Sequence, residues 1–148
     1  MRALVQRVSQ ASVSADGKVI GEIRQGLLVF LGVREGDTEV DTAKLAKRVT
    51  NLRIFADRDG KMNLSLLDTS GEMLIVSQFT LYGDTKGGNR PSYSEAAKPA
   101  TAEPLYQNFI RLCENQGVTV ATGLFGAHMK VALINDGPVT LICSTESY

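Results

Sequence analysis

The chain has 148 residues, of which 43% are apolar and 22% charged, values that are ordinary for a soluble globular protein and argue against a disordered one. A domain of this length buries about 70% of the surface that its unfolded chain exposes, so it needs no disulfide or metal to hold it together. Sixteen basic residues balance sixteen acidic ones. Because proteins that wrap long stretches of nucleic acid usually carry net positive charge, any nucleic-acid contact is expected to be local.

No segment of the sequence is typical of a membrane or secreted protein. The longest apolar runs, Leu27–Val33 and Met73–Val76, fall far short of the ~20 residues that a membrane helix needs. Gln6 and Arg7 interrupt the apolar start of the chain, which excludes a signal-peptide core there. We therefore expect a cytoplasmic protein that makes no membrane contact.

The residues that most often hold metals or attack substrates are few. Cys113 and Cys143 lie in apolar surroundings without CxxC spacing, which predicts two buried, reduced thiols. The single histidine, His128, is either structural or a general base, and a catalytic triad would have to use it. The sequence contains no GxGxxG, P-loop or GxSxG motif. We expect neither a metal nor a cofactor.

The first third of the chain predicts β-structure. Ala11–Ser14 alternates apolar and polar residues, and Asp16-Gly17 separates it from a second extended segment, Lys18–Ile23. Asp-Gly between two such segments is the strongest short-range hairpin signal, because both central residues of a type I′ turn need positive φ. The continuous apolar run Leu27–Val33 predicts a strand that is covered on both faces.

A helix is predicted after this strand. Thr38–Asp41 resembles a capping box, in which a hydroxyl and a carboxylate satisfy the first free N–H groups. Its core-facing residues are expected to be Val40, Leu45, Val49 and Leu52. Short extended segments at Leu52–Ala56 and Met62–Leu67 should then flank an Asp59-Gly60 turn.

Leu74–Tyr82 is the strongest strand candidate of the chain. Gly83–Pro99, rich in glycine, proline and serine, predicts a long irregular segment of a kind that is usually functional or disordered. A second helix is expected to begin at Thr101, with Pro104 in its first turn and Gly117 after its end. Three further strands are predicted, at Val118–Thr122, Lys130–Ile134 and Val139–Ser144.

This order of elements favours an α+β fold. Strands predominate and do not alternate strictly with helices, so a doubly wound parallel sheet is excluded. We expect a single domain with a mostly antiparallel or mixed, barrel-like β-sheet on which two main helices pack.

Two segments are candidates for chemistry. Ser77-Gln78-Phe79-Thr80 lies at the predicted end of a buried strand, where scaffolds often place reactive groups, although these are equally suitable as half-buried strand residues. Asn135–Thr140 contains Gly137-Pro138 between two predicted strands. Proline removes a donor from the ladder, and X-Pro is the only peptide bond whose cis form is cheap, at roughly 0.5–1 kcal/mol. A plain turn is the alternative interpretation there.

Together these segments resemble the pair of signature motifs of the D-aminoacyl-tRNA deacylases, formerly called D-tyrosyl-tRNA deacylases. The likeness covers residues 1–148, as a single deacylase domain, and both signature motifs are intact. It also includes the stretches Met1–Arg7, Gly26–Gly32, Lys86–Pro91 and Thr122–Met129.

The resemblance implies a homodimeric proofreading enzyme that hydrolyses the ester between a D-amino acid and the 3′-terminal adenosine of tRNA. It implies that the catalytic site is lined by Ser77, Gln78, Phe79 and Thr80, and that Phe125 and Met129 lie near the adenosine. An aminoacyl ester is already labile, so backbone N–H groups around Phe79 and Thr80 and a 2′-hydroxyl of the RNA are sufficient for the chemistry. Thr80 as a covalent nucleophile is the alternative, but no base lies near it in sequence.

The resemblance further implies that the Gly137-Pro138 bond is cis and that this step reaches into the partner subunit's site. Its carbonyl groups would exclude L-amino acids, and Arg7 would help to hold the segment. Such a filter would accept many D-side chains and would not exclude glycine, which makes glycyl-tRNA a further substrate. Two other functions remain open: a non-catalytic module that binds the end of an RNA, and a small-molecule-binding oligomer.

Overall fold

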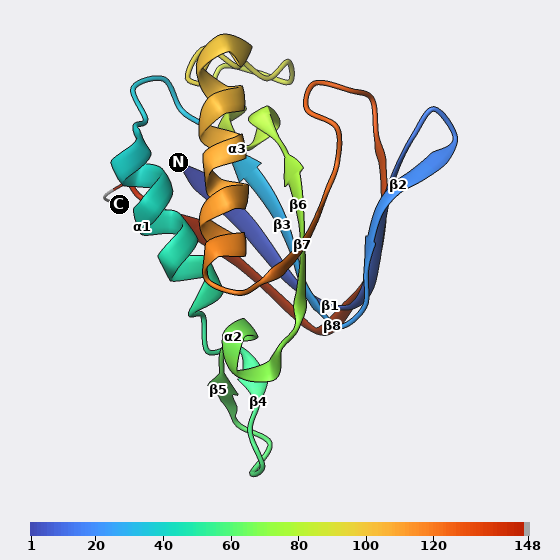
Figure 1. The fold of residues 1–148 in the computed structure, drawn as a ribbon. Coiled ribbons are helices and arrows are strands. Elements are labelled where there is room, and N and C mark those ends of the chain that lie inside the picture. The colour runs from blue at the N-terminus through green and yellow to red at the C-terminus, as the bar shows by residue number, and fades with distance from the viewer. Residues whose placement is uncertain (147–148) are drawn as a thin grey trace.

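The two longest strands, β1 (Arg2–Ala15) and β8 (Lys130–Ser144), pair antiparallel along almost their whole length. On its other edge β1 pairs with β3 (Gly26–Gly32) and, further along, with β2 (Lys18–Ile23). The computed structural model describes residues 1–146 of the chain. Its strands form a curved mixed sheet on which two helices pack (Figure 1), which confirms the predicted fold class.

The sheet continues from β3 through two parallel strands. β6 (Glu72–Ser77) lies parallel to β3, and β7 (Thr119–Thr122) lies parallel to β6. At the far end of the sheet, Gly21 of β2 approaches β7 so closely that a Cβ atom there would lie 2.7 Å from the carbonyl oxygen of Thr122. The first and last strands of this path therefore nearly meet, and the sheet forms an almost closed barrel.

The predicted hairpin and the predicted buried strand are confirmed. Asp16 and Gly17 both have positive φ, 51° and 73°, as a type I′ turn requires. Leu27, Leu28 and Val29 of β3 are fully buried, because the helices cover one face of this strand and the inside of the barrel covers the other.

Helices α1 (Glu39–Thr50) and α3 (Pro99–Asn115) pack against each other and against the sheet. The capping box is confirmed, since the Thr38 N–H donates to Asp41 Oδ2 at 2.9 Å and lowers the pKa of that carboxyl. Val40 was wrongly placed on the buried face and is 67% exposed. It precedes Leu45 by five residues, a spacing that puts the two on different sides of a helix. The residues that α1 buries are Thr42, Leu45, Ala46, Val49 and Thr50.

Several predicted boundaries are wrong. The strand expected over Leu74–Tyr82 ends at Ser77, and Phe79–Tyr82 forms a 3-10 turn, η1. The cause is the end of the neighbouring strand β3 at Gly32, beyond which the chain pairs with the segment before α3 instead, as the Ala97 N–H donates to the Val33 carbonyl at 3.0 Å. Helix α3 begins at Pro99, so Pro104 lies in its second turn rather than its first.

The connection between α1 and β6 is also less extended than predicted. Only β4 (Phe55–Ala56) and β5 (Met62–Leu64) are strands, and they form a small separate hairpin. α2 (Leu66–Thr69) replaces the end of the second extended segment, because Ser65 and Asp68 form a capping box there. Lys130–Ile134 and Val139–Ser144 belong to the single strand β8, whose pairing with β1 is interrupted between them.

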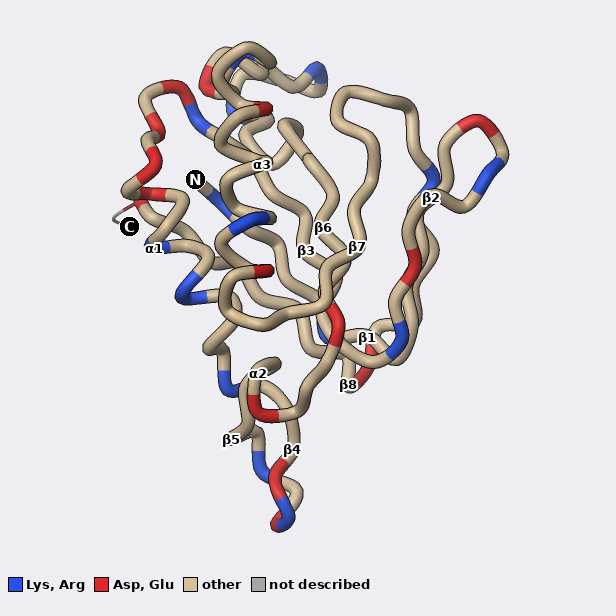
Figure 2. The backbone as a smooth tube through the Cα atoms, viewed as in Figure 1, with Lys and Arg blue, Asp and Glu red and all other residues tan. Residues whose placement is uncertain are grey.

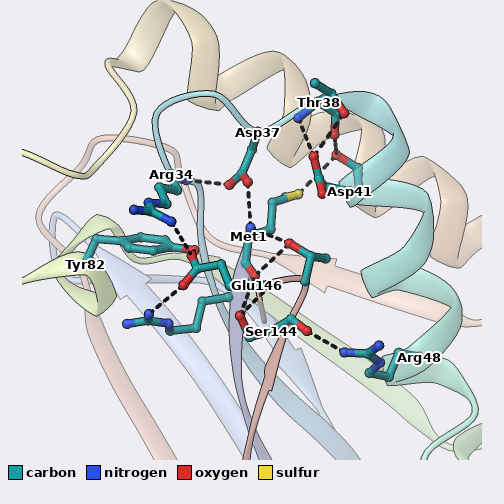
Figure 3. Close-up of polar contacts among 12 residues, drawn as sticks. Met1, Arg34, Asp37, Thr38, Asp41, Arg48, Tyr82, Ser144 and Glu146 are labelled. Carbon is teal, nitrogen blue, oxygen red and sulfur yellow. Dashed lines mark hydrogen bonds and ion pairs between the residues drawn. The ribbon is translucent and has the colours of Figure 1, made fainter. Parts of the chain in front are cut away.

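A buried ion pair joins the first residue to two later parts of the chain (Figure 3). The Met1 ammonium donates to Asp37 Oδ1 and to Thr145 Oγ1, each at 2.8 Å, and the Met1 side chain is fully buried. The other Asp37 oxygen accepts the Arg34 N–H at 2.6 Å. This cluster links the start of β1, the loop before α1 and the end of β8. Within residues 1–146, no helix has the length and apolar character needed to cross a membrane.

The Asp37→Asn variant tests this cluster. It keeps the side-chain shape but removes the charge that faces a buried ammonium group, so we expect the free energy of unfolding to fall by about 2–3 kcal/mol. Chemical denaturation at pH 7 measures the change, with the exposed Asp59→Asn as the control. A loss no larger than that of the control would contradict a stabilising role for the ion pair.

Candidate active site

A cavity of about 630 Å³ opens where β6 ends and η1 begins. Its walls come from the ends of β3 and β6, the start of α3, and the two irregular segments that precede α3 and β8. The lining residues are Leu31, Val33, Val76, Ser77, Gln78, Phe79, Tyr93, Ala96, Ala97, Pro99, Ala102, Tyr106, Phe125, Gly126, Ala127, His128, Met129 and Val131.

The structure brings five of the predicted site residues into this one cavity. Ser77, Gln78 and Phe79 form one side, and Phe125 and Met129 contribute from a segment far along the chain. Thr80 is exposed and does not line the cavity; its Oγ1 accepts a hydrogen bond from Gln78 Nε2. The two candidate groups that sequence reasoning assigned to the ester and to the adenosine thus share a cavity.

The parallel pairing of β3 with β6 positions the start of η1. Ser77 is in register with Leu31, and the Gln78 N–H donates to the Leu31 carbonyl oxygen at 2.8 Å. The chain then turns sharply, as the Leu81 N–H bonds back to the Gln78 carbonyl. As a result the N–H groups of Phe79 and Thr80, the first two of the turn, donate to no group within residues 1–146. Two free backbone donors lie together beside the cavity.

Aromatic residues shape the rest of the cavity. Tyr106 donates its hydroxyl to the Ile75 carbonyl at 3.0 Å, and burial raises the pKa of this hydroxyl to about 12, so it stays protonated. Its ring packs against Phe125, with the centroids 5.7 Å apart. Phe79 makes an edge-to-face contact with Tyr93 at 5.1 Å. The sequence analysis did not select Tyr93 or Tyr106. Tyr106 lies three residues before Phe109 in α3, and this helical spacing could have placed both on the buried face.

The cavity contains few groups that suit covalent catalysis. Within the described residues, 1–146, no carboxylate and no cysteine lines it, and no cluster of metal-ligating side chains occurs. The sequence left His128 as either a structural residue or a general base. It is exposed at the cavity, and its side chain makes no hydrogen bond within residues 1–146. What the cavity does offer is an apolar surface, the Ser77 hydroxyl, the Gln78 amide and backbone donors.

The Gly137-Pro138 segment lies elsewhere in the chain. Its peptide bond is cis, and residues 136–138 are exposed and pair with no residue of β1. Arg7 donates through Nε to the Asp136 carbonyl at 3.3 Å and through Nη1 to the Ile54 carbonyl at 2.6 Å. Asn135 Nδ2 donates to the Arg7 and Val139 carbonyls, at 2.9 and 3.0 Å. These contacts fix the base of a projecting segment.

This segment does not contribute to the cavity of its own chain. It projects beside Arg7 of β1, which is in register with Leu27 and, through it, with Met73 near the start of β6. Ser77 lies at the opposite end of β6. The two candidate segments therefore belong to different ends of the sheet, and one site that used both would need two chains.

These features define a class of protein: an α+β fold with a nearly closed mixed sheet, an apolar cavity at one strand end, and a projecting cis Gly-Pro step. The chain belongs to the D-Tyr-tRNA(Tyr) deacylase family, whose model matches residues 4–144. A D-aminoacyl-tRNA deacylase of Thermosipho africanus is 57% identical, over 99% of this chain and 98% of the relative. One of Dehalococcoides mccartyi is 59% identical, over 99% and 95%.

Solved structures share the fold. The structure named c-Myc DNA Unwinding Element Binding Protein superimposes with a TM-score of 0.93 at 36% identity, covering 99% of this chain and 100% of that one. A probable eukaryotic D-amino acid tRNA deacylase superimposes with a TM-score of 0.83 at 17% identity, over 96% of this chain and 97% of the other. At that identity the second match supports the fold alone.

Both thiols should be chemically inert in the folded protein. Burial raises the pKa of Cys113 to about 12, and it also raises the pKa of Cys143. With a pKa of about 12, only about one Cys113 thiol in 10⁴ is ionised at pH 8. We expect iodoacetamide to modify neither residue in buffer at pH 8 and both in urea, as measured by mass spectrometry. Rapid alkylation of the folded protein would contradict the burial of these residues.

Proposed function

We propose that this protein hydrolyses the ester between a D-amino acid and the 3′-terminal adenosine of tRNA, releasing the D-amino acid and free tRNA. The observation that carries the proposal is the 57–59% identity, across nearly the whole chain, to proteins named D-aminoacyl-tRNA deacylase. The cavity that joins Ser77–Phe79 with Phe125 and Met129 supports it. We place this proofreading reaction in the cytoplasm, where tRNA is charged, and assign it to residues 1–148 as one domain.

The proposed reaction needs no side-chain nucleophile. Water attacks the ester carbonyl carbon, the bond to the ribose 3′-oxygen breaks, and that oxygen takes up a proton. The free N–H groups of Phe79 and Thr80 would hold the negative charge that develops on the carbonyl oxygen. One such donor is worth roughly 3–4 kcal/mol of transition-state stabilisation. The adjacent 2′-hydroxyl of the RNA would orient the water, which agrees with a cavity that contains no carboxylate among the described residues.

The adenosine is assigned to the wall formed by Phe125 and Met129. The Phe125 ring is held against Tyr106, and the Met129 sulfur accepts the Leu124 N–H at 3.4 Å, so both side chains have fixed neighbours. Flat aromatic and thioether groups suit the faces of a purine base. Ser77 and Gln78, on the other side, remain available for the aminoacyl ester.

Chiral selection is assigned to Gly137-Pro138 of a partner subunit in a homodimer. The segment is exposed and anchored, and it lies at the wrong end of the sheet to reach its own cavity. Large apolar side chains flank it on β8: Ile134 is 53% exposed and Ile142 is 60% exposed. Exposed apolar residues grouped along a strand are typical of a surface that a partner covers. A wall of backbone carbonyl groups would reject L-side chains by steric exclusion, and it would admit glycine.

A deacylation assay tests the proposal directly. Labelled D-tyrosyl-, L-tyrosyl- and glycyl-tRNA are incubated with the protein, and free amino acid is measured over time. We expect rapid release from the D-ester and from glycyl-tRNA, and no release from the L-ester above the spontaneous rate. Retention of tRNA on a filter without release of amino acid would instead support an RNA-end-binding module. If the protein neither binds tRNA nor releases amino acid, the proposal is overturned.

Thr80→Ala distinguishes backbone catalysis from covalent catalysis. Thr80 does not line the cavity, and its hydroxyl already accepts a hydrogen bond from Gln78, so we expect the variant to keep a substantial part of the single-turnover rate. Removal of a true nucleophile costs several decades of rate in triad enzymes, and a loss beyond about four decades would establish Thr80 as the nucleophile.

Gly137→Ala tests whether the position of the projecting segment matters. A Cβ atom would lie 2.7 Å from Arg7 Nη2 and 2.9 Å from Val139 Cγ2, at a φ of +114° that L-residues rarely adopt. It would therefore point toward its own chain and displace the segment, rather than enter the substrate's space directly.

We expect this variant to lose at least tenfold in D-ester hydrolysis without gaining L-ester hydrolysis. Gly60→Ala is the matched control, because Gly60 also has positive φ, +77°, but a Cβ there meets nothing within 4 Å. Equal rates for the two variants would show that Gly137 has no part in the site.

A further inference from the structure

We propose that a basic groove on α1 binds phosphate groups of the tRNA acceptor stem while the 3′ end of that tRNA occupies the partner subunit's cavity. The inference rests on the proposed function and names the part of the substrate that this second surface recognises. The groove, called the α1 groove below, has a volume of about 570 Å³. It is lined by Lys44, Lys47, Arg48, Asn51, Leu52, Arg53 and Thr145.

The charge of the α1 groove is entirely positive. Its four cations are exposed, and no acidic residue lines it among residues 1–146, although the whole chain has a formal net charge of zero. Figure 2 shows the basic positions following one another along the lower half of α1 and into the segment after it. A cluster of one sign in a neutral protein marks a local site for an anion, which agrees with the small nucleic-acid contact expected from composition.

Two of these cations, Lys47 and Arg48, lie in the last turn of α1, where positive charge interacts favourably with the helix dipole. Lys44, Lys47 and Arg48 follow at spacings of three and four residues, so they lie on one face and repel each other. None of the ion pairs within residues 1–146 involves these three side chains. The Asp41 carboxylate attracts Lys44 and the Asp68 carboxylate attracts Arg53, but neither forms an ion pair with the groove, and both are hydrogen-bonded to the capping residues of α1 and α2. An external anion bound in the groove would relieve the repulsion that remains among the three cations.

Two arginines of the groove are held in place by neutral groups. Arg48 Nη1 donates to the Ser144 carbonyl (Figure 3), and Arg53 Nε donates to the Asn63 carbonyl at 3.0 Å. Carbonyl acceptors orient a guanidinium group without cancelling its charge, and each arginine keeps further N–H groups free. Guanidinium groups with free parallel donors bind phosphate oxygens in pairs, which suits the sugar-phosphate backbone.

The position of the groove favours RNA over other polyanions. Arg53 directly precedes Ile54, whose carbonyl accepts a hydrogen bond from Arg7, and Arg7 also holds Asp136. One end of the groove is therefore joined to the anchor of Gly137-Pro138. If this segment enters the partner's cavity, the groove lies next to that cavity. An RNA whose 3′ end is in the partner's cavity would then bring the phosphates of its stem to this surface.

The double variant Lys44→Gln/Lys47→Gln tests the groove, because both side chains are exposed and neither makes a hydrogen bond within the described part of the chain. Lys18→Gln/Arg24→Gln is the control, since it removes the same charge from exposed positions of β2 and the segment after it. Two substrates are compared: D-tyrosyl-tRNA, and 3′-O-(D-tyrosyl)adenosine, which has no phosphate.

We expect the groove variant to raise KM for D-tyrosyl-tRNA about tenfold, with kcat and the hydrolysis of the tyrosyl-adenosine unchanged. The dependence of log(kcat/KM) on log salt should become shallower by about 1.8, the value for two lost phosphate contacts to a duplex stem. The control should behave as the wild type. An unchanged KM for the tRNA, or an equal loss on both substrates, would overturn the proposal.

The failure of the proposed function is distinguishable from the failure of this inference. If the wild type hydrolyses neither substrate, the proposed function is wrong, and filter binding of uncharged tRNA still decides on the groove. Equal affinities of the wild type and the groove variant would then overturn it. Binding of the wild type to vesicles rich in anionic lipid, with none to tRNA, would assign the groove to a membrane and also overturn it.

Mixed dimers test which subunit's groove acts on a given cavity. In one subunit the Ala127→Trp substitution fills the cavity. The homodimer of this variant is assayed first, to establish that the filled cavity is inactive. The neutral groove is placed either on that same subunit or on the other one. We expect a raised KM for tRNA only when both changes are on one subunit, because the active cavity then faces the neutral groove. The opposite pattern, or a protein that remains monomeric, would overturn the assignment to the partner.

Discussion

The pairing of β1 with β8 is the constraint on which the arrangement of this molecule depends. β8 follows β1 on one edge while β3 and β2 share the other, so both edges of β1 are occupied. Between Val8↔Asn135 and Gln6↔Thr140 the two strands differ in length by several residues. Because β1 pairs with β2 and β3 on its other edge, it cannot bulge to match β8. The extra residues of β8 therefore leave the sheet and form the projecting Gly137-Pro138 segment. Arg7, the residue of β1 at this interruption, is thereby the one placed to anchor the segment.

Local signals in the sequence were sufficient where local interactions decide the structure. The Asp16-Gly17 turn depends on two backbone conformations, and the start of α1 depends on Thr38 and Asp41 within one turn, so both were predictable. Prediction failed where a distant segment decides. The strand over Leu74–Tyr82 ends early because β3 ends beside it, and nothing within those nine residues signals that event. The early start of α3 at Pro99 is a different case, because it depends on neighbouring residues: the Thr101 and Ala102 N–H groups donate to the Lys98 carbonyl.

The candidate site was predictable only in part for the same reason. Ser77–Thr80 and Asn135–Thr140 were recognised as motifs, yet their spacing along the chain contained no information about which end of the sheet each would occupy. Register provides that information. The parallel pairing of β3 with β6 brings Ser77 to the cavity, and the antiparallel pairing of β1 with β8 directs Gly137 to the other end. Thr80 belongs to the same motif but does not line the cavity, and its role in the site stays a prediction.

The cavity and the Gly137-Pro138 segment lie at opposite ends of the sheet, so the proposed catalysis and substrate recognition use different parts of the chain. The cavity is apolar and aromatic, and no carboxylate among residues 1–146 lines it, which suits the proposed reaction, stabilised by backbone donors rather than by an ionised side chain. The positive charge that an RNA needs is found instead on α1, beside the anchor of the projecting segment. A single chain therefore holds a pocket at one end and, at the other, the segment proposed to select the substrate together with the groove proposed to bind its phosphates. Two chains related by a twofold axis would place the second set against the first, so that catalysis and recognition of one tRNA come from different subunits.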